Sequence, residues 1–393
     1  NRLGLVFFPA FDWAISPFHP EREERLLYTR DQVVEEGLLD IEGIYEYNPF
    51  VVDDEFIQQA HICVPEIERR VTRSHRISAG GAIKAGQSVL EGEVDKAFAL
   101  VRPPGHHARR IVHGARGFCI INIEAVMIEY LRSTYGVEKI AVVDTDCHHG
   151  DGTQDIYWND PNVLFISLHQ DGRTLYPGTG FIDDLGGPAA RGYNLNIPLP
   201  PGTSDDSLIY IMENLILPIL DEFNPDIVIN SAGQDNHYSD PLTNMNISAQ
   251  GYAELNHCLD PDLAVLEGGY AIEDALPYVN TGIILAMAGL DYTEVKEPDY
   301  NPDRLQEDTE TRERINKICH EVQSTWQARR VCREKSSFTT RRSVYHDTDG
   351  ISEKQKETYF CCPRCPGFSR IDYQASNNEK IIAFILARNI CHK

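Results

Sequence analysis

The stretch DTDCHHGDGT, residues 144–153, concentrates ionisable side chains directly after the apolar run KIAVV. Buried charges are costly unless they are paired or bound to a metal, which disfavours a purely structural role for this cluster. Asp146 and His148 are two residues apart on an extended segment, so both side chains share a face, and Asp144 shares it too. A carboxylate beside an imidazole supplies half of a divalent-metal site. The alternative is an aspartate that caps the following turn and hydrogen-bonds a histidine.

A third metal ligand is offered by SAGQDNHYSDP, residues 231–241. Asp235 follows a turn of small residues at the end of an apolar run, where the backbone can approach a neighbouring segment closely. Capping of the next helix is its alternative role. His237 and Asp240 are weaker candidates because they lie further into the loop. Gln234 directly precedes Asp235, and we expect its side chain to point away from the metal.

Two further clusters carry groups that move protons or stabilise charge. RPPGHHARR contains the adjacent His106 and His107, and a histidine pair is suited to proton transfer near neutral pH. LEGGY places Tyr270 after two glycines, where its hydroxyl could stabilise an oxyanion. Taken alone, the histidines would equally fit a metal pair or an exposed surface, and the tyrosine would fit a core position.

Each of these clusters follows an apolar run that predicts a buried strand, and a fifth such run ends at the polar cluster SLH. The five runs are 96–101, 139–144, 162–168, 226–232 and 262–268. Such strands, alternating with helical patterns, are typical of a parallel sheet with helices on both faces. We expect helices at 122–132 and at 205–223, the second interrupted at Pro218. Because ligands bind outside the carboxyl ends of such strands, the polar clusters predict one composite site.

The sequence resembles the histone deacetylase family, since it carries the following motifs in that family's order and spacing: RPPGHHA, GFCIINIEAV, DTDCHHGDGT, SLH, YPGTG, SAGQD, DPL and LEGGY. The resemblance spans about residues 5–295 and looks strongest to class II and bacterial deacetylase-like members. It implies an α/β fold of the arginase type, with three layers around a mainly parallel sheet. It also implies zinc-dependent hydrolysis of the amide of acetyl-lysine, or of a related acylated amine, with release of acetate.

The resemblance further implies a role for each motif residue. The Zn²⁺ ligands would be Asp146, His148 and Asp235. His107 would act as general base and acid, with His106 as its electrostatic partner. Tyr270 would hydrogen-bond the substrate carbonyl and the tetrahedral oxyanion. The remaining implied residues are Asp144 behind His106, Asp151 behind His107, and Asp144, Asp146, His148, Ser167 and Leu168 at a structural K⁺.

The resemblance also implies the walls of an acyl-lysine tunnel. These walls would comprise Gly117, Phe118, Tyr176 and Leu242. Leu242 matches members that act on acyl-lysine, whereas polyamine-selective relatives carry an acidic gatekeeper near this position. His149 is left without a catalytic role, and we expect it to be structural.

Composition limits the range of partners. The chain has 36 Lys and Arg residues against 60 Asp and Glu residues, a formal net charge of −24. This balance argues against nucleic acid, which needs a basic surface, although acidity also serves solubility. We recognise no signal peptide and no apolar run of membrane-spanning length, so we expect a cytoplasmic protein without a membrane partner. Homo-oligomerisation stays open.

The composition changes after about residue 300. We expect a deacetylase catalytic domain over 1–300, a charged helical connector over 301–344 and a cysteine-rich, zinc-ribbon-like appendage over 345–393 that could be truncated. Within the last two parts, SSFTTRRS is interpreted as a linker, and SRIDYQA and EKIIAFIL as strands.

The appendage holds a second group of metal-binding residue types. Cys362 and Cys365 have the knuckle spacing of a zinc ribbon, and Cys391 offers a third ligand. Cys361 or His392 could complete the set. The alternative is a cluster of reduced thiols in a small β-hairpin.

Two other functions remain open at this point. A ureohydrolase-like hydrolase with two manganese ions could use the same fold, but it would need further Asp and His ligands. A non-catalytic acyl-lysine-binding or scaffold protein is the other alternative, and the presence of every catalytic position argues against it.

Overall fold

The central feature of the computed structural model is an eight-stranded sheet with the strand order β2-β1-β4-β10-β9-β6-β7-β8, in which every pair is parallel. The structure describes residues 1–16, 18–63, 70–329, 337–346, 349–362, 364–388 and 391. The strands of this sheet are β1 (Leu3–Phe8), β2 (Ile44–Tyr47), β4 (Lys96–Val101), β6 (Ile140–Asp144), β7 (Val163–Gln170), β8 (Asn194–Leu199), β9 (Ile227–Ala232) and β10 (Leu263–Leu266). A short parallel pair, β3 (Ile62–Cys63) and β5 (Ile111–Val112), lies outside it.

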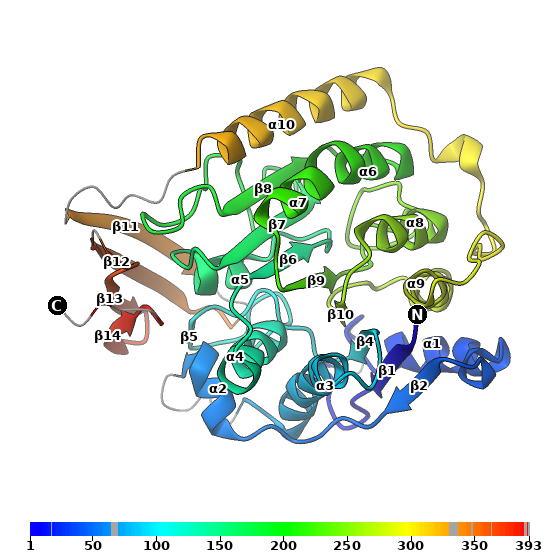
Figure 1. Cartoon of the computed structure of the whole chain (residues 1–393), viewed down its shortest axis with the longest axis horizontal. Helices are drawn as coiled ribbons and strands as arrows, with labels where there is room; N and C mark the ends of the chain where they lie inside the picture. The colour runs from blue at the N-terminus through cyan, green and yellow to red at the C-terminus, as the bar shows by residue number, and fades with distance from the viewer. Residues whose placement is uncertain are drawn as a thin grey trace.

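Helices connect these strands and cover both faces of the sheet (Figure 1). The α-helices are α1 (Glu24–Glu35), α2 (Asp54–Ala60), α3 (Arg73–Leu90), α4 (Ile123–Tyr135), α5 (Asp151–Tyr157), α6 (Asp205–Ile211), α7 (Leu217–Phe223), α8 (Ala249–Leu259), α9 (Leu276–Ala288) and α10 (Thr309–Gln327). Shorter helical turns are η1 (Leu38–Asp40), the π-helical η3 (Met212–Ile216) and η4 (Pro302–Arg304).

Alternate residues of each strand point to opposite faces of the central sheet. They therefore belong to two separate hydrophobic cores, one on each face. On β4, Phe98 and Leu100 pack with α1 and with the helices from α6 to α10. Their neighbours Ala97, Ala99 and Val101 pack with α2 to α5. Every residue of β4 is buried, and all of them after Lys96 are apolar, as expected for a parallel sheet covered on both faces. The sequence therefore specifies three layers.

The strand predictions are confirmed with small shifts in their bounds, and β4 matches its predicted range. The predicted helix 205–223 is interrupted, because a π-helical turn separates α6 from α7 and Pro218 lies in the first turn of α7. Proline has no N–H to donate to a carbonyl in the preceding turn, which accounts for the interruption. The strands β1, β2 and β8 were not predicted.

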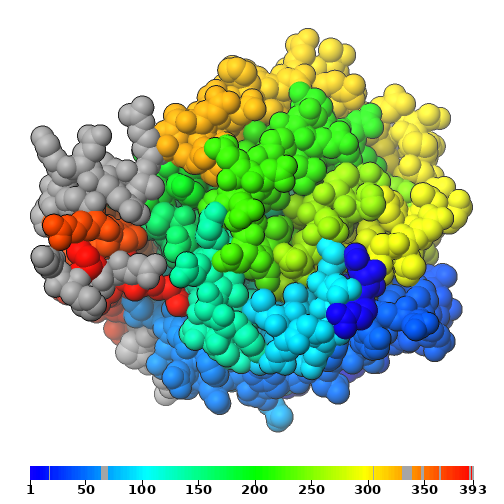
Figure 2. Space-filling view, viewed as in Figure 1, coloured from blue at the N-terminus to red at the C-terminus, as the bar shows by residue number. Residues whose placement is uncertain are grey.

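A second sheet follows α10 and is antiparallel throughout. It consists of β11 (Ser337–His346), β12 (Ser352–Cys361), β13 (Phe368–Ala375) and β14 (Lys380–Leu386), in that order. Ile371 and Tyr373 on β13 pack against Ile111 of β5, and this contact joins the second sheet to the part of the chain that contains the central sheet. In the space-filling view this sheet lies at one end of the molecule (Figure 2).

The predicted linker at 336–343 is wrong for the residues that the structure describes. Residues 337–343 belong to β11, which pairs with β12 along its whole length. The C-terminal sheet thus begins before the expected boundary at residue 345. The polar composition of this segment does not prevent strand formation, because its backbone pairs with β12 over ten residues and the Tyr345 side chain is buried. The helical part of the expected connector is α10. The two predicted C-terminal strands are confirmed as β13 and β14.

Within the part of the chain that the structure describes, every helix is too short or too polar to cross a bilayer.

The central sheet supplies a stability test. Phe98 has no exposed surface, so we expect Phe98→Ala to lower the free energy of unfolding by about 3–5 kcal/mol through lost burial and a residual cavity. Denaturant unfolding followed by circular dichroism measures this loss. The matched control is Val34→Ala on α1, whose side chain is 55% exposed and should change stability by less than about 0.5 kcal/mol. Equal effects of the two substitutions would contradict the assignment of Phe98 to the core.

Candidate active site

Polar groups from neighbouring strands meet at the carboxyl edge of the central sheet. The tandem histidines follow β4, Tyr270 follows β10 and Asp235 follows β9. Asp146 and His148 follow β6. These four strands are adjacent in the sheet order, which brings the four clusters together as the sequence predicts.

Asp146, His148 and Asp235 form a compact group of ligand atoms. One atom from each side chain can be chosen so that all three lie within 4.8 Å of one another. His148 Nδ1 lies 2.8 Å from Asp235 Oδ2 and 3.2 Å from Asp146 Oδ1. Both carboxylates are fully buried. The three residues predicted as metal ligands are therefore positioned to share one ion.

Backbone N–H groups fix the two carboxylates. Asp146 Oδ2 accepts a hydrogen bond of 2.7 Å from Gly268 N, and Asp235 Oδ1 accepts one of 2.7 Å from Cys147 N. A Cβ at Gly233 would lie 2.1 Å from Asp146 Oδ2, and one at Gly268 would lie 2.4 Å from Asp235 Oδ2. Glycine is therefore required at both positions, and the close backbone approach predicted for the SAG turn is found.

The electrostatics of this group suit a cation. Burial disfavours the charged form of His148, but the carboxylates of Asp235 and Asp146 outweigh it and raise the pKa of His148 to about 10. Burial also opposes ionisation of Asp146, yet His106 and His148 hold the pKa of that carboxyl well below its usual range. Two carboxylates and an imidazole are a donor set that Zn²⁺ accepts, with a fourth position for water or substrate. The residues present fit a divalent cation.

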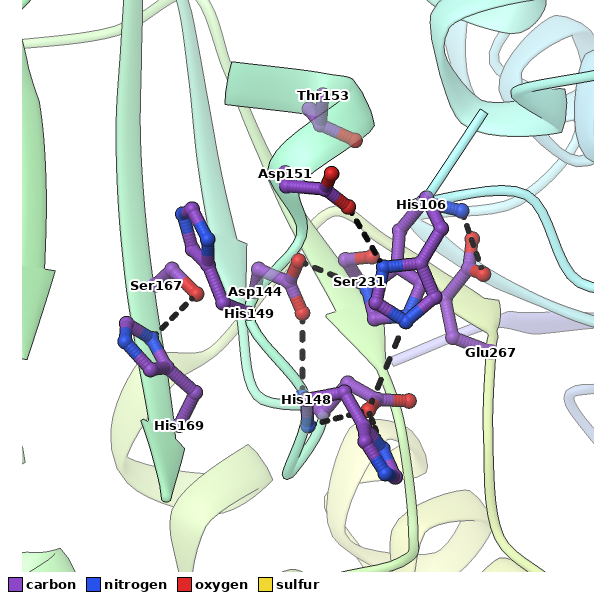
Figure 3. A network of polar contacts seen from close by, with 12 residues as sticks. His106, Asp144, His148, His149, Asp151, Thr153, Ser167, His169, Ser231 and Glu267 are labelled. Atoms are coloured by element: carbon purple, nitrogen blue, oxygen red, sulfur yellow. Dashed lines mark hydrogen bonds and ion pairs between the residues drawn. The ribbon is translucent and has the colours of Figure 1, made fainter. Parts of the chain in front are cut away.

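The tandem histidines contact different carboxylates. His106 Nδ1 lies 3.1 Å from Asp144 Oδ2, and His107 Nδ1 lies 2.8 Å from Asp151 Oδ1. Asp144 is the last residue of β6 and Asp151 is the first residue of α5, and both are labelled in Figure 3. The two dyads follow the pairing that the family resemblance implies.

The pKa values of the two adjacent histidines are shifted in opposite directions. Burial lowers the pKa of His107 to about 4, and the neighbouring His106 adds to this effect. Burial acts in the same direction on His106, but Asp146 and Asp144 outweigh it and raise its pKa well above the usual value. A neutral His107 that donates through Nδ1 to Asp151 has a lone pair at Nε2 for accepting a proton.

Glu267 is a buried carboxylate that the sequence analysis did not single out. Its Oε2 accepts hydrogen bonds from Gly105 N at 2.6 Å and from His106 N at 2.9 Å, the second visible in Figure 3. Burial raises the pKa of Glu267 to about 7. This side chain fixes the backbone of the histidine pair. An acidic residue directly after the apolar strand, within the LEGGY motif, is the signal that could have identified it.

Two arginines near Asp151 were also missed. Arg116 Nη2 donates a 2.7 Å hydrogen bond to Asp151 Oδ2, and Arg109 Nη1 lies 3.9 Å from the same oxygen. Burial opposes ionisation of Asp151, but Arg116 and His107 hold its pKa well below the usual range. Asp151 therefore stays ionised behind His107. The sequence offered no local signal, because basic residues in loops are common.

Tyr270 is buried, and both its backbone N–H and its aromatic ring contact neighbouring side chains. Its N–H donates a 2.7 Å hydrogen bond to Asp240 Oδ2, and the Arg25 guanidinium lies 4.9 Å from the ring centroid. Burial raises the pKa of Tyr270 well above its usual value, so its hydroxyl remains a hydrogen-bond donor. Asp240, a weak metal candidate, thus shapes this turn. His237 lies 2.9 Å from Ser239 Oγ and outside the ligand group.

Aromatic rings surround the catalytic candidates. The Phe118 and Tyr270 rings are 5.6 Å apart edge to face, and the Tyr176 ring lies 5.2 Å from that of His107. Gly117 has φ +48°, and a Cβ there would lie 2.2 Å from His107 Cδ2, so glycine is required. Leu242 lies on the loop after β9 and is 37% exposed. The first three predicted tunnel residues therefore border the site.

The other residues singled out in the sequence are placed as follows. Asp144 and Ser167 face each other in the register of β6 and β7, and Leu168 follows on β7. His149 Nδ1 lies 2.8 Å from Thr179 Oγ1, and His149 Nε2 lies 3.0 Å from Gln154 Oε1. Both ring nitrogens therefore have partners away from the metal-ligand group, which is consistent with the structural role expected for His149.

Gln234 donates to Asn280, away from Asp235, as expected. At the end of the C-terminal sheet, Cys362, Cys365 and Cys391 form a separate group of ligand atoms within 4.8 Å of one another.

Comparisons with known proteins agree with this geometry. The family described as "Histone deacetylase domain" matches residues 62–287. A "Probable deacetylase" of Archaeoglobus fulgidus is 44% identical over 331 residues, which cover 77% of this chain and 91% of that protein. A "Histone deacetylase-like amidohydrolase" of Pseudomonas aeruginosa is 37% identical over 255 residues, covering 59% of this chain and 66% of that protein.

A solved structure described as the HDA15 HD domain is similar in fold. It superposes with a TM-score of 0.72 at 27% identity and covers 84% of this chain and 96% of that one. The family match spans more than half of the chain, and the archaeal relative shares nearly its whole length with it. The chain therefore belongs to the histone deacetylase family, and its central sheet between two layers of helices has the arginase-like fold of that family.

Proposed function

We propose that the chain hydrolyses the amide of acetyl-lysine, or of a related acylated amine, and releases acetate. The observation that carries this proposal is the meeting, at one edge of the sheet, of the Asp146–His148–Asp235 group with His107 and Tyr270. Among the described residues, that edge gathers three ligands rather than the larger set that a two-manganese centre needs, which favours a single ion.

The ion would be held by Asp146, His148 and Asp235. When bound, a divalent cation such as Zn²⁺ would acidify a water molecule and polarise the amide carbonyl. Chemistry of this kind needs an open coordination position, which a set of three protein ligands leaves. We also propose that a structural K⁺ lies beside the catalytic ion, at Asp144, Asp146, His148, Ser167 and Leu168.

Proton transfer and stabilisation of charge are assigned to three other side chains of the site. His107 accepts the proton of the attacking water at Nε2 and then donates it to the departing amine, so that the amine leaves neutral. Asp151 stabilises the imidazolium that exists between these steps, since it stays ionised and contacts His107 Nδ1. The Tyr270 hydroxyl donates a hydrogen bond to the oxygen that becomes an oxyanion.

The walls of the site favour a long, thin substrate. Phe118 and Tyr176 present aromatic surfaces beside Tyr270 and His107, which suits the aliphatic stem of lysine. Leu242 presents no charge at its exposed position, so nothing at this residue attracts a second ammonium group of a polyamine. We therefore propose acyl-lysine as the preferred substrate class.

Two substitutions test the catalytic roles. We expect Tyr270→Phe to lower kcat about 10²–10³-fold and His107→Ala about 10²–10⁴-fold, since each removes a group that acts in the transition state. An assay with an acetyl-lysine peptide and zinc-loaded protein measures this. Tyr210→Phe is the matched control, because Tyr210 is 42% exposed on α6. Turnover close to that of the unmodified chain in either active-site variant would refute the mechanism.

A third substitution tests the ligand assignment. Asp235→Ala removes one of two carboxylates from the group, and we expect it to lose the catalytic metal ion. Elemental analysis of the purified protein should show about one equivalent less zinc per chain. Asp206→Ala is the control, because its side chain is 82% exposed on α6. Zinc content equal to that of the control would exclude Asp235 as a ligand.

A further inference from the structure

Three cysteine thiols meet at one end of the C-terminal sheet. Cys362 directly follows β12, Cys365 lies in the loop before β13, and Cys391 follows β14. The Sγ atom of Cys391 lies 3.5 Å from that of Cys362 and 3.6 Å from that of Cys365. The group thus joins one turn of the sheet to a segment more than 25 residues further along the chain.

The turn that carries two of these thiols has a specific shape. Arg364 N donates to Cys362 Sγ at 3.5 Å, so the backbone already directs an N–H at the sulfur. Gly367 has φ +80°, and a Cβ there would lie 1.9 Å from the Phe360 carbonyl oxygen. Glycine is therefore needed to close the turn and bring Cys365 beside Cys362.

The distances between the sulfur atoms match those of a shared ion. Zinc–thiolate bonds of about 2.3 Å at tetrahedral angles place neighbouring sulfur atoms about 3.8 Å apart. A disulfide would require about 2.05 Å. The observed separations of 3.5 and 3.6 Å lie close to the first value and far from the second.

We propose that Cys362, Cys365 and Cys391 bind Zn²⁺ as thiolates at a structural site separate from the Asp146–His148–Asp235 group. Each thiol releases its proton to solvent as the sulfur binds the ion. A water molecule takes the fourth coordination position in this proposal. Thiolates are soft ligands and select zinc over magnesium or calcium.

Such a site has a structural consequence for the sheet. Among the described residues, the fully packed core of this sheet is small and centres on Ile371, Tyr373 and Ala375. A sheet of this size needs more than its apolar contacts for stability. Binding free energy at the cysteines would contribute to folding directly, because the three ligands are together only when the strands are paired.

Cobalt substitution of the full-length chain tests the site. Co²⁺ bound to thiolates gives a sulfur-to-metal charge-transfer band in the near ultraviolet, whereas a site of carboxylates and imidazole gives none. We expect this band in the unmodified chain and in Asp235→Ala, and we expect Cys365→Ser and Cys391→Ser each to lose it. Each cysteine variant should also lose about one equivalent of zinc per chain.

Cys258→Ser is the matched control, because Cys258 is a half-buried thiol on α8 that contacts Glu254. It should keep both the band and the full zinc content. Absence of the band from the cobalt-loaded unmodified chain would overturn the proposal, and that measurement requires no variant to fold. A Cys362–Cys391 disulfide found by mass spectrometry in the chain as purified would overturn it as well.

A different observation carries a second inference, which rests on the proposed function. Tyr345 on β11 lies behind the Asp151–His107 dyad. Its ring centroid is 3.3 Å from the guanidinium carbon of Arg109 and 5.4 Å from that of Arg116. The next residue on the strand, His346, accepts a 3.3 Å hydrogen bond from Arg116 Nη1 through its carbonyl.

This contact links the second sheet to the catalytic histidine. Arg116 donates to Asp151, and Arg109 forms an ion pair with Asp155 one turn further along α5. Stacking on an aromatic face restricts where a guanidinium can point. We infer that Tyr345 is a positioning residue, which holds the two arginines so that Asp151 keeps His107 in its productive tautomer.

Kinetics on an acetyl-lysine peptide test this inference. We expect Tyr345→Ala to lower kcat about tenfold with KM unchanged, and Tyr345→Phe to retain kcat because the stacking ring remains. Ile371→Ala is the control for general damage to the sheet, since Ile371 is a buried side chain of the same sheet that packs with Ile111, Tyr373 and Ala375. Equal losses in Tyr345→Ala and Ile371→Ala, or no loss in Tyr345→Ala, would refute the positioning role.

A second readout separates this inference from the proposed function. The ring resonances of His107 in NMR spectra should shift in Tyr345→Ala and stay in place in Tyr345→Phe. If the unmodified chain fails to hydrolyse acetyl-lysine, the proposed function is wrong. Unshifted His107 resonances in Tyr345→Ala would refute the positioning role whether or not the peptide is a substrate.

Discussion

Buried negative charge is the constraint on which the rest of the site depends. Asp144, Asp146, Asp235 and Glu267 are fully buried within one edge of the sheet. Four carboxylates in so small a volume are unstable unless positive charge or hydrogen-bond donors reach them. His106 and His148 supply imidazoles, and backbone N–H groups after three different strands supply donors. The divalent cation proposed for the Asp146–His148–Asp235 group would complete the compensation, so metal binding there would also stabilise this edge of the sheet.

The same constraint explains why a parallel sheet suits this chemistry. All its strands end at one edge, so loops from β4, β6, β9 and β10 deliver side chains to a common point. Glycines at 233 and 268 let these loops approach within hydrogen-bond distance of the carboxylates. The contacts at Asp151 extend outward from this edge through Arg116 to the antiparallel sheet. Although the two sheets have separate hydrophobic cores, a continuous series of polar contacts connects Asp151 to the antiparallel sheet.

Much of this arrangement could be predicted from the sequence, for identifiable physical reasons. Strands such as β4 are buried on both faces and consist almost entirely of apolar residues, so they can be recognised in the sequence. The ionisable residues that follow them are conspicuous because they interrupt apolar runs. The spacing of Asp146 and His148, together with the family motifs, then indicated the ligands and both dyads.

The missed features depend on partners that are distant in sequence. Glu267 and Arg116 acquire their roles from His106 and Asp151, and no local pattern records those contacts. The strand β11 is polar, and it became recognisable as a strand only through its pairing with β12. Strand formation there is decided by tertiary contacts, so composition alone suggested a linker.

The order of strands in the central sheet has a consequence for how the chain acquires its fold during synthesis. β4 lies between β1, which precedes it, and β10, whose Leu263 pairs with Ala97. A ribosome therefore releases β4 more than 160 residues before its second neighbour exists. Until then, one edge of this mainly apolar strand lacks its native neighbour, and such unpaired edges are sites of aggregation in nascent chains.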